Sequence, residues 1–455
     1  MSLYTRLVSS ALFPLHERMK GHASVQLRRE LERTQWLGPD EIGRLQGDRL
    51  RRFLEEIGRR VPYYRDMFAR IGFDPRAVRS AADLAALPLL DKRTIRAAGD
   101  SLRAVDAGKL SRYNTGGSSG EPLVFYIGKG RRTHDVAAKW RATRWWGVDI
   151  GDREIVVWGS PIELGAQDWM RLSRDRLLRS TLLPAFEMSA ANLDRFVDEI
   201  VRVRPAMVFG YPSSLAMIAA HAKQRRVDLS HLGVKVAFVT SERLYDHQRE
   251  SISSVFGSPV ANGYGGRDAG FIAHECPHGG MHLSAEHIAV EIVDGEGQPA
   301  PTGAAGEIVV THMATADFPF VRYRTGDIGI LDGAACPCGR GLPMLKEIQG
   351  RSTDFVVAED GTVMHGLALI YTIRDLPGVE RFRIVQHAVD NVEVEVVANA
   401  SFHRDDEQTI RESFRKRLGA GVRVDISKVL DIAPEKSGKY RYVVSHVVNG
   451  RATTH

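Results

Sequence analysis

Helical spacing dominates the first hundred or so residues of the chain. Six apolar residues recur at roughly three-to-four spacing among charged ones: Ile42, Leu45, Leu50, Phe53, Leu54 and Ile57. This pattern predicts amphipathic helices, and the run Leu87-Pro88-Leu89-Leu90 then breaks it. We therefore expect a helical N-terminal segment over residues 1–105.

A different pattern fills residues 106–354. Short apolar runs at residues 155–158, 207–209 and 234–239 alternate with helical stretches, as they do in βαβ units. Between residues 280 and 332 the chain changes to turns and alternating strands. The pattern predicts an α/β body that contains a β-rich subdomain.

The last hundred residues form a third region. Strand-like alternation at residues 381–386 and 392–397 is followed by a charged, helical stretch over residues 405–418. We expect a small α+β domain over residues 355–455.

Length and composition agree with a globular protein of more than one domain. At 455 residues the chain exceeds the size at which one hydrophobic core stops growing. Hydrophobic residues make up 43% and charged residues 26%, which excludes a disordered or fibrous class. The net charge of +6 comes from bases interleaved with acids, as in residues 29–33, and not from a basic tract that could follow a nucleic acid. We expect a nucleotide, and no nucleic acid, as the anionic partner.

No apolar run reaches the roughly 18 residues that can span a bilayer. The best early candidate, residues 7–15, contains two serines and a proline and leads into charged residues without a signal-peptide cleavage site. The three cysteines do not suggest a disulfide framework. We expect a cytoplasmic protein without a transmembrane segment.

The most informative stretch is Thr115-Gly116-Gly117-Ser118-Ser119-Gly120-Glu121-Pro122. Its glycines let main-chain N–H groups approach an anion, and its hydroxyls add further donors. This combination favours a phosphate-binding loop over a plain flexible turn.

Two other kinds of site share parts of this stretch. Residues 116–120 match the G-x-S-x-G elbow of serine hydrolases, with Ser118 as the nucleophile. An elbow lies between a strand and a helix, whereas Ser118 is followed by Pro122 and a strand-like run at residues 123–127. A Walker A loop does not fit, because Thr115 and Glu121 stand where its first glycine and its lysine belong.

Four more motifs follow in order along the chain: Tyr264-Gly265-Gly266-Arg267-Asp268, Tyr323-Arg324-Thr325-Gly326-Asp327, Gly350-Arg351-Ser352-Thr353-Asp354 and Pro434-Glu435-Lys436-Ser437-Gly438-Lys439. Together with the glycine-rich stretch they resemble the signature of the phenylacetate-CoA ligase family of adenylate-forming (ANL) enzymes, and the chain looks closest to members associated with capsular polysaccharide clusters. The resemblance implies the α/β ANL fold: a large multi-subdomain body with a β-rich subdomain, and a small α+β C-terminal lid.

The same resemblance implies a function and a set of site residues. The function is ATP-dependent activation of a carboxylic acid through an acyl-adenylate, followed by transfer of the acyl group. The ATP-binding residues would be Thr115, Gly116, Gly117, Ser118, Ser119, Gly120, Tyr264, Gly265, Asp327 and Arg351.

Three residues would act in the chemistry or in domain motion. Asp268 would help hold Mg²⁺, a cation that suits carboxylate and phosphate oxygens. Lys439 would stabilise charge that develops in the transition state, with Lys436 as the poorer candidate. Asp354 would be the hinge residue between body and lid.

Departures from the family pattern bear on the metal and on the acceptor. Glu121 stands where many relatives have lysine, and Asp268 replaces the usual glutamate. Residues 357–366 lack the Arg-Gly-rich loop that CoA-forming relatives carry after the hinge. The acceptor is therefore open among CoA, a carrier-protein thiol, an amine and a sugar hydroxyl, while the resemblance puts the acid near residues 209–214 and 239–242.

A structural metal site is a separate prediction. Cys276, Cys336 and Cys338, with either His278 or His282, supply the Cys₃His set that suits tetrahedral zinc. Some family members have a cysteine and a histidine at the separation of Cys276 and His282, so the resemblance favours His282.

Two alternative functions come from other classes. A serine hydrolase would use Ser118 and need no ATP. A catalytically silent relative would bind a nucleotide or nothing and serve as a binding or scaffold protein.

Overall fold

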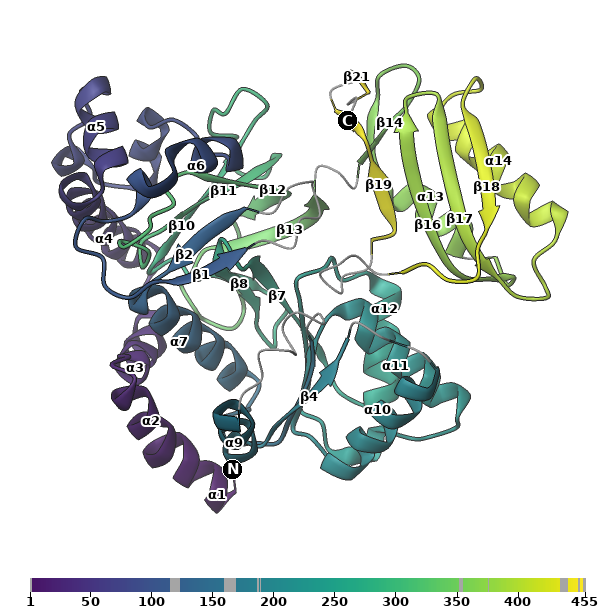
Figure 1. Ribbon diagram of the computed structural model, residues 1–455, viewed down its shortest axis with the longest axis horizontal. Coiled ribbons are helices and arrows are strands. Elements are labelled where there is room, and N and C mark those ends of the chain that lie inside the picture. Colours follow the sequence, from purple (N-terminus) through teal and green to yellow (C-terminus); the bar gives the residue numbers. More distant parts are fainter. Residues whose placement is uncertain are drawn as a thin grey trace. The chain divides into compact units, whose positions relative to one another are not determined.

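The computed structural model describes residues 2–114, 123–158, 169–185, 188, 190–351, 355–374, 376–433, 441–448 and 451–452 (Figure 1). The chain divides into two compact units, of which the first runs to Ile348 and the second begins at Gln349. No helix among the described residues is long and apolar enough to cross a membrane.

Helices form the N-terminal part of the first unit: α1 Leu3–Leu7, α2 Phe13–Met19, α3 Ser24–Thr34, α4 Pro39–Arg60, α5 Pro62–Ile71 and α6 Lys92–Ala98. Helix α4 begins where the Glu41 side chain accepts the Gly38 N–H at 3.0 Å, and it ends before Pro62, which cannot continue it. The helix predicted from the apolar spacing is confirmed, since Ile42, Leu50 and Ile57 are among its buried residues.

Within the described residues, an eleven-stranded sheet in the order β10-β11-β12-β13-β9-β8-β7-β6-β5-β3-β4 organises this unit. Its strands are β3 Glu154–Trp158, β4 Ser180–Pro184, β5 Met207–Gly210, β6 Val236–Thr240, β7 Val260–Gly266, β8 Gly270–Glu275, β9 Met281–Leu283, β10 Ile288–Val293, β11 Ala305–His312, β12 Tyr323–Asp332 and β13 Met344–Arg351. The strands from β4 to β7 pair in parallel, and β7, β8 and β9 continue antiparallel.

The parallel half of the sheet is covered on both faces. The covering helices are α7 Lys129–Trp145, α9 Trp169–Leu178, α10 Ala190–Val203, α11 Pro212–Gln224 and α12 Asp246–Phe256. Phe196, Ile218 and Phe256 of α10 to α12 pack on one face, whereas Ala142 of α7 packs with Phe238 on the other. Strands that are buried on both faces have continuous apolar sequences, so these strands could be predicted from the sequence.

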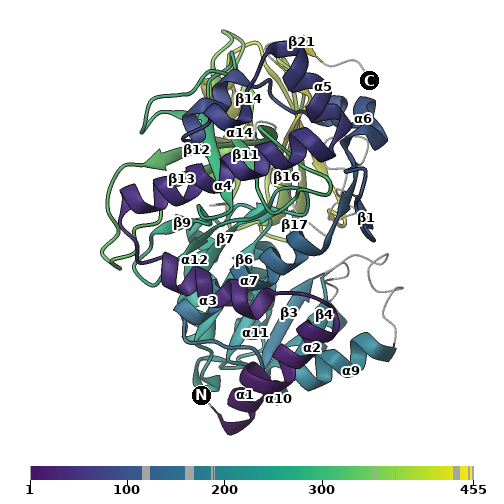
Figure 2. The same ribbon diagram turned by 90° about the vertical axis from the view of Figure 1, so that its left-hand side faces the viewer.

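The antiparallel half packs against the N-terminal helices. Figure 2 shows α4 lying across β11 and β12, and Leu50 and Phe53 of α4 share one core with Ile308 and Tyr323 of those strands. A small hairpin, β1 Ser111–Asn114 with β2 Val124–Ile127, joins this core through Phe125.

The second unit has its own sheet in the order β18-β17-β16-β19. Its described elements are β14 Phe355–Val357, β15 Val363–His365, α13 Leu367–Arg374, β16 Val379–Ala388, β17 Asn391–Ala398, α14 Arg404–Leu418, β18 Arg423–Lys428, β19 Val443–Ser445, β20 Val447–Val448 and β21 Arg451–Ala452. Ile384, Val394 and Phe414 are fully buried. The predicted strands and the predicted charged helix are therefore confirmed.

Candidate active site and metal centre

Hydrogen bonds from two tyrosines connect two motifs that lie far apart in the sequence. Tyr323, at the start of β12, donates its hydroxyl to Asp268 Oδ2 at 2.6 Å. Tyr264, in β7, donates its hydroxyl to Asp327 Oδ2 at 2.8 Å. Each acid is therefore held by the tyrosine of the other acid's motif, so these two hydrogen bonds fix the positions of both carboxylates.

Burial favours these hydrogen bonds. It raises the pKa of Tyr264 well above its ordinary value, and the carboxylate of Asp327 raises it further. The phenol therefore stays protonated and acts as a donor to Asp327.

Asp327 lies at a bulge in β12, where the pairing with β11 shifts register. The Thr325 hydroxyl donates to the Ile308 carbonyl at 2.7 Å and accepts the Asp327 N–H at 3.1 Å. Gly326 has a φ of +76°, a left-handed value that glycine adopts without strain. The residues before Asp327 therefore suit the backbone shape of the bulge.

Asp268 lies in the tight turn between β7 and β8. The Ala269 N–H donates to Asp268 Oδ1 at 3.1 Å. A Cβ on Gly265 would lie 2.1 Å from the Gly270 carbonyl oxygen, so residue 265 has to be glycine for the two strands to approach. Gly265 therefore acts through the backbone geometry of the turn.

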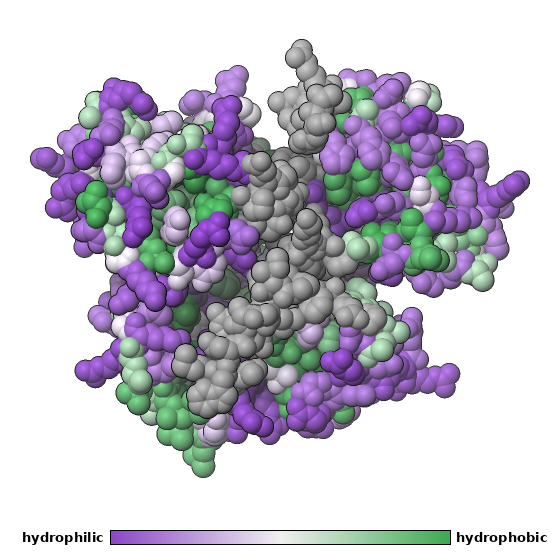
Figure 3. Space-filling model, in the orientation of Figure 1, coloured by the Kyte–Doolittle hydropathy of each residue, from purple (hydrophilic) through white to green (hydrophobic). Residues whose placement is uncertain are grey.

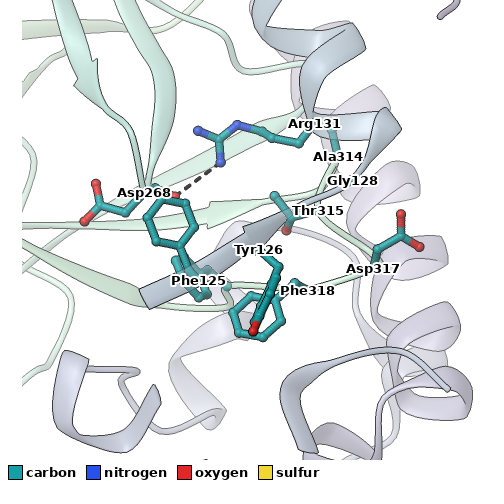
Figure 4. A pocket seen from close by; sticks show the side chains of 10 residues that line it. Phe125, Tyr126, Gly128, Arg131, Asp268, Ala314, Thr315, Asp317 and Phe318 are labelled. Atoms are coloured by element: carbon teal, nitrogen blue, oxygen red, sulfur yellow. Dashed lines mark hydrogen bonds between the residues drawn. The ribbon is translucent and has the colours of Figure 1, made fainter. Parts of the chain in front are cut away.

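Arg131 of α7 donates hydrogen bonds to the same turn. Its guanidinium donates to the Asp268 carbonyl at 3.2 Å and to the Arg267 carbonyl at 3.3 Å, and Figure 4 shows it reaching toward Asp268. The open recess beside it has about 290 Å³ of empty space and is lined by Phe125, Tyr126, Gly128, Arg131, Asp268, Ala314, Thr315, Asp317, Phe318 and Phe320.

The glycine-rich stretch starts beside this turn. The Arg267 side chain donates to the Asn114 carbonyl at 3.3 Å, so the residue before Thr115 contacts the residue before Asp268. Asn114 pairs with Val124 across the β1–β2 hairpin. The described segments that precede and follow Ser118 are therefore two antiparallel strands, β1 and β2, whereas a hydrolase elbow lies between a strand and a helix.

Several predicted site residues lie outside the described residues: Thr115, Gly116, Gly117, Ser118, Ser119, Gly120, Asp354 and Lys439. Arg351 is the last residue of β13 and belongs to the second unit. Of the predicted nucleotide-binding and catalytic residues, the structure brings together Tyr264, Gly265, Asp268 and Asp327.

The segments predicted for the acid meet at the carboxyl ends of parallel strands. Tyr211 follows β5 and stacks on Trp158 at the end of β3, with ring centroids 4.4 Å apart. Glu242, beyond β6, accepts the Ser213 N–H at the start of α11 at 3.2 Å. Ligands of open α/β sheets bind at this edge, although Tyr211 itself is 3% exposed and packs in the core beneath it.

Arg322 is a positioning residue that sequence reasoning missed. It is 3% exposed, has a φ of +52°, pairs with the buried Glu291 at 3.0 Å and donates to the Leu87 carbonyl at 2.6 Å. Its own carbonyl accepts the Leu90 N–H at 2.9 Å. It therefore anchors the start of the Tyr323–Asp327 motif to the segment that breaks the N-terminal helical pattern.

The three cysteines and His282 form one compact group. Cys276 Sγ and Cys336 Sγ are 3.6 Å apart, His282 Nε2 is 3.2 Å from Cys338 Sγ, and all four ligand atoms lie within 4.8 Å of one another. Ligands of tetrahedral zinc, with bonds of about 2.0 to 2.3 Å, lie roughly 3.5 to 3.8 Å apart. The exposed His278 is not part of the group.

The surroundings of the group suit a metal. His282 Nδ1 lies 3.3 Å from the Leu342 carbonyl, the second contact that orients a ligating imidazole and leaves Nε2 toward the ion. A Cβ on Gly280 would lie 2.6 Å from Cys336 Sγ, so glycine leaves room for the sulfur.

The protonation of the group follows from burial and from hydrogen bonds. Burial raises the pKa of the Cys276 thiol to about 12 and lowers the pKa of His282 to about 4. Burial also opposes ionisation of Cys338, but hydrogen bonds from Arg340 outweigh it and lower that pKa.

A second group of possible ligands, His134, Asp135 and His312, is a poor metal site. The Arg131 Nε atom donates to both carboxylate oxygens of Asp135, at 2.9 and 3.0 Å. A metal cation would have to displace this guanidinium from Asp135 and would then be repelled by its positive charge. The group therefore suits a buried polar network.

Family models and curated proteins match long parts of the chain. A model for AMP-binding enzymes matches residues 179–317, and a model for the CapK C-terminal domain matches residues 356–446. Protein CapK of Staphylococcus aureus is 22% identical over 90% of each chain. The phenylacetate-coenzyme A ligases of Thermus thermophilus and Pseudomonas putida are 25% and 27% identical, covering 82% and 81% of this chain and 84% of each relative.

Solved structures show the same fold. A 2-hydroxyisobutyryl-CoA ligase in complex with R3-HIB-AMP superposes with a TM-score of 0.70 over 88% of each chain, at 22% identity. The anthranilate CoA ligase AuaEII in complex with anthranoyl-AMP gives 0.51 over 72% of this chain and 66% of that one, at 16% identity. The predicted α/β fold of adenylate-forming ligases is thereby confirmed.

Proposed function

We propose that this chain is an adenylate-forming enzyme of the phenylacetate-CoA ligase-like family, related to CapK, and that its own residues activate a carboxylic acid. A carboxylate oxygen attacks the α-phosphorus of ATP, the bond to the β-phosphate breaks, and pyrophosphate leaves. An acceptor then attacks the acyl carbon of the acyl-adenylate, and AMP leaves.

The reciprocal pairing of Tyr323 with Asp268 and of Tyr264 with Asp327 is the observation that carries this proposal. We assign Asp327 to the ribose hydroxyls, because one carboxylate can accept both hydrogen bonds. The Tyr264 ring would lie against the adenine. A fixed pair of carboxylates in one place suits a reaction that depends on positioning and on neutralising phosphate charge.

Asp268 is assigned to Mg²⁺. Magnesium binds through one or two carboxylates together with substrate phosphate oxygens, and the single carboxylate of Asp268 fits that need. The contact of Arg267 with Asn114 supports phosphate binding by residues 115–120, since that stretch begins beside the same turn. Bound Mg²⁺ would offset negative charge on the phosphates.

We assign the remaining catalytic, nucleotide-binding and hinge roles to residues of the second unit. Lys439 would stabilise the charge that develops between carboxylate and α-phosphate, Arg351 would assist nucleotide binding, and Asp354 would act as the hinge. These roles rest on the sequence motifs.

CoA is the acceptor that the names of the relatives support. A carrier-protein thiol, an amine and a sugar hydroxyl are the other proposed acceptors, because residues 357–366 lack the Arg-Gly-rich loop. Release of AMP in the presence of each acceptor separates these four cases.

We also propose that Cys276, His282, Cys336 and Cys338 bind one zinc ion. Four protein ligands leave no position for water, so the ion would be structural. It would join the β8–β9 turn, which carries Cys276, to the loop between β12 and β13, which carries Cys336 and Cys338.

Exchange of labelled pyrophosphate into ATP tests the first half-reaction. With a panel of aromatic, fatty and sugar acids, we expect exchange that requires both one class of acid and Mg²⁺, and that Lys439→Ala abolishes. If none of the acids in the panel supports exchange, the protein would be a catalytically silent relative. Labelling of Ser118 by a fluorophosphonate, with Ser118→Ala as control, would support a hydrolase.

A further inference from the structure

The first two helices expose a row of apolar side chains. Leu3, Leu7, Leu15 and Met19 are 85%, 52%, 58% and 81% exposed, and Ala11 between them is exposed as well. They recur at every fourth position. Figure 3 shows the corresponding hydrophobic surface at the lower left, over α1 and α2.

The opposite face of these helices already holds them to the body. Val8 is fully buried and Phe13 packs edge-on against Trp140, with ring centroids 5.2 Å apart. The Thr5 hydroxyl donates to Asp152 at 2.8 Å, and the Tyr4 hydroxyl donates to a main-chain carbonyl of α9 at 2.7 Å. A docked helix needs one apolar face, so the exposed row is not explained by packing on this chain.

A local change in helix type keeps the row on one side. Four residues of α-helix turn about 40° beyond a full turn, so a row at every fourth position drifts around an ordinary helix. Residues Val8–Leu12 form a π-helix, in which four residues turn less than a full turn. The π-helical turn therefore partly cancels the drift between Leu7 and Leu15.

The charges beside the row have one sign. Arg6, Arg18 and Lys20 are exposed next to its members, whereas Glu17, the only acid among residues 2–23, is 3% exposed and accepts the Ser24 hydroxyl at 2.6 Å. A two-fold pairing of two copies through this face would bring the same cations together. An anionic surface would neutralise them.

We propose that α1 and α2 dock on anionic lipid headgroups at a membrane surface. The row from Leu3 to Met19 enters the boundary between headgroups and acyl chains, and Arg6, Arg18 and Lys20 contact the lipid phosphates. The helices lie in the interface plane and do not span the bilayer. This docking is independent of the proposed ligase reaction.

Flotation of the full-length protein with lipid vesicles tests this surface. We expect binding to vesicles of phosphatidylcholine with phosphatidylglycerol, weaker binding at high salt, and little binding to phosphatidylcholine alone. The quadruple variant Leu3→Ser, Leu7→Ser, Leu15→Ser, Met19→Ser and the triple variant Arg6→Glu, Arg18→Glu, Lys20→Glu should each bind at least about tenfold more weakly.

Matched changes elsewhere serve as controls. Val105→Ser with Leu430→Ser removes two exposed apolar side chains, and Arg404→Glu with Lys416→Glu reverses two exposed charges. Both double variants should bind like the unaltered protein. The proposal would be overturned if all variants bound vesicles equally, or if the protein bound neither kind of vesicle. It would also be overturned if light scattering showed a dimer that the quadruple variant dissociates.

Discussion

The carboxylates of Asp268 and Asp327 each accept a hydrogen bond from a tyrosine far away in the sequence. The hydrogen bond from Tyr323 to Asp268, at 2.6 Å, joins residues 55 positions apart, and that from Tyr264 to Asp327 joins residues 63 positions apart. A hydrogen bond to a charged group contributes about 1.5 to 3 kcal/mol. These contacts can therefore decide where the carboxylates stand when substrate binds.

Tyr323→Phe should weaken the reaction through the metal. Without the hydroxyl, Asp268 loses its fixed orientation, so we expect about a tenfold fall in the rate of pyrophosphate exchange and a higher Mg²⁺ requirement. Titration of exchange with Mg²⁺ measures both effects.

Tyr64→Phe is the matched control. The buried Tyr64 hydroxyl donates to the Pro319 carbonyl at 3.1 Å and accepts the Val321 N–H at 3.2 Å, and it bonds to neither Asp268 nor Asp327, so its loss should lower stability without changing the Mg²⁺ requirement. Equal Mg²⁺ curves for Tyr323→Phe and the unaltered protein would contradict the positioning role.

Side chains that have few other uses in their pattern could be recognised from the sequence. Asp268, Asp327 and the cysteines stand in motifs whose residue types and spacing indicate chemistry. Arg131 and Arg322 could not be found, because the contacts that link them to the site go to main-chain carbonyls, which residues of any type supply. The pairing of tyrosines with acids also needed the fold.

The metal group joins two elements that are not adjacent in sequence. Cys276 and His282 flank the β8–β9 turn, while Cys336 and Cys338 lie in the long loop that leads into β13. Without an ion, the turn and the loop would lack the bonds from the metal to its four ligands. The proposed zinc would therefore stabilise the turn and the loop together.

Cys336→Ser should remove the zinc. We expect about one zinc ion per purified chain, none in the variant, and a melting temperature several degrees lower. His278→Ala alters an exposed histidine outside the group and should keep the metal. Zinc retained in Cys336→Ser, or lost in His278→Ala, would show that the ligand set is wrong.

At the scale of elements, apolar runs predicted the strands but not their order. Strands β5 and β6 consist of buried residues throughout, and the sequence shows them as continuous apolar runs. The position of β4 at the sheet edge and the pairing of β9 with β13 depend on contacts between distant segments. Periodicity carries no information about such pairing.

The whole molecule buries several histidines in the neutral form. His134, His287 and His312 lie side by side, with ring centroids 5.2 and 4.7 Å from His134, and burial lowers the pKa of each. In the unfolded chain each returns to a pKa of about 6.5. The unfolded state therefore binds more protons below that pH, and stability falls as the pH is lowered.

Urea unfolding at about pH 7.5 and about pH 5.5 measures this effect. Each of the three histidines should reduce the free energy of unfolding as the pH falls across that interval, because its imidazole takes up a proton on unfolding. His312→Gln should make the dependence shallower, whereas the exposed His231→Gln should leave it unchanged. A dependence of equal slope in His312→Gln would mean that this histidine is not buried neutral.

In the proposed mechanism, the carboxylate of the substrate bonds directly to the α-phosphorus of ATP. The measurement uses an acid found by the exchange panel, labelled with heavy oxygen in its carboxylate, together with ATP, Mg²⁺ and hydroxylamine as acceptor. The mechanism predicts that AMP gains one heavy oxygen from the acid and pyrophosphate gains none. Heavy oxygen in inorganic phosphate, or in no phosphorus-containing product, would contradict it.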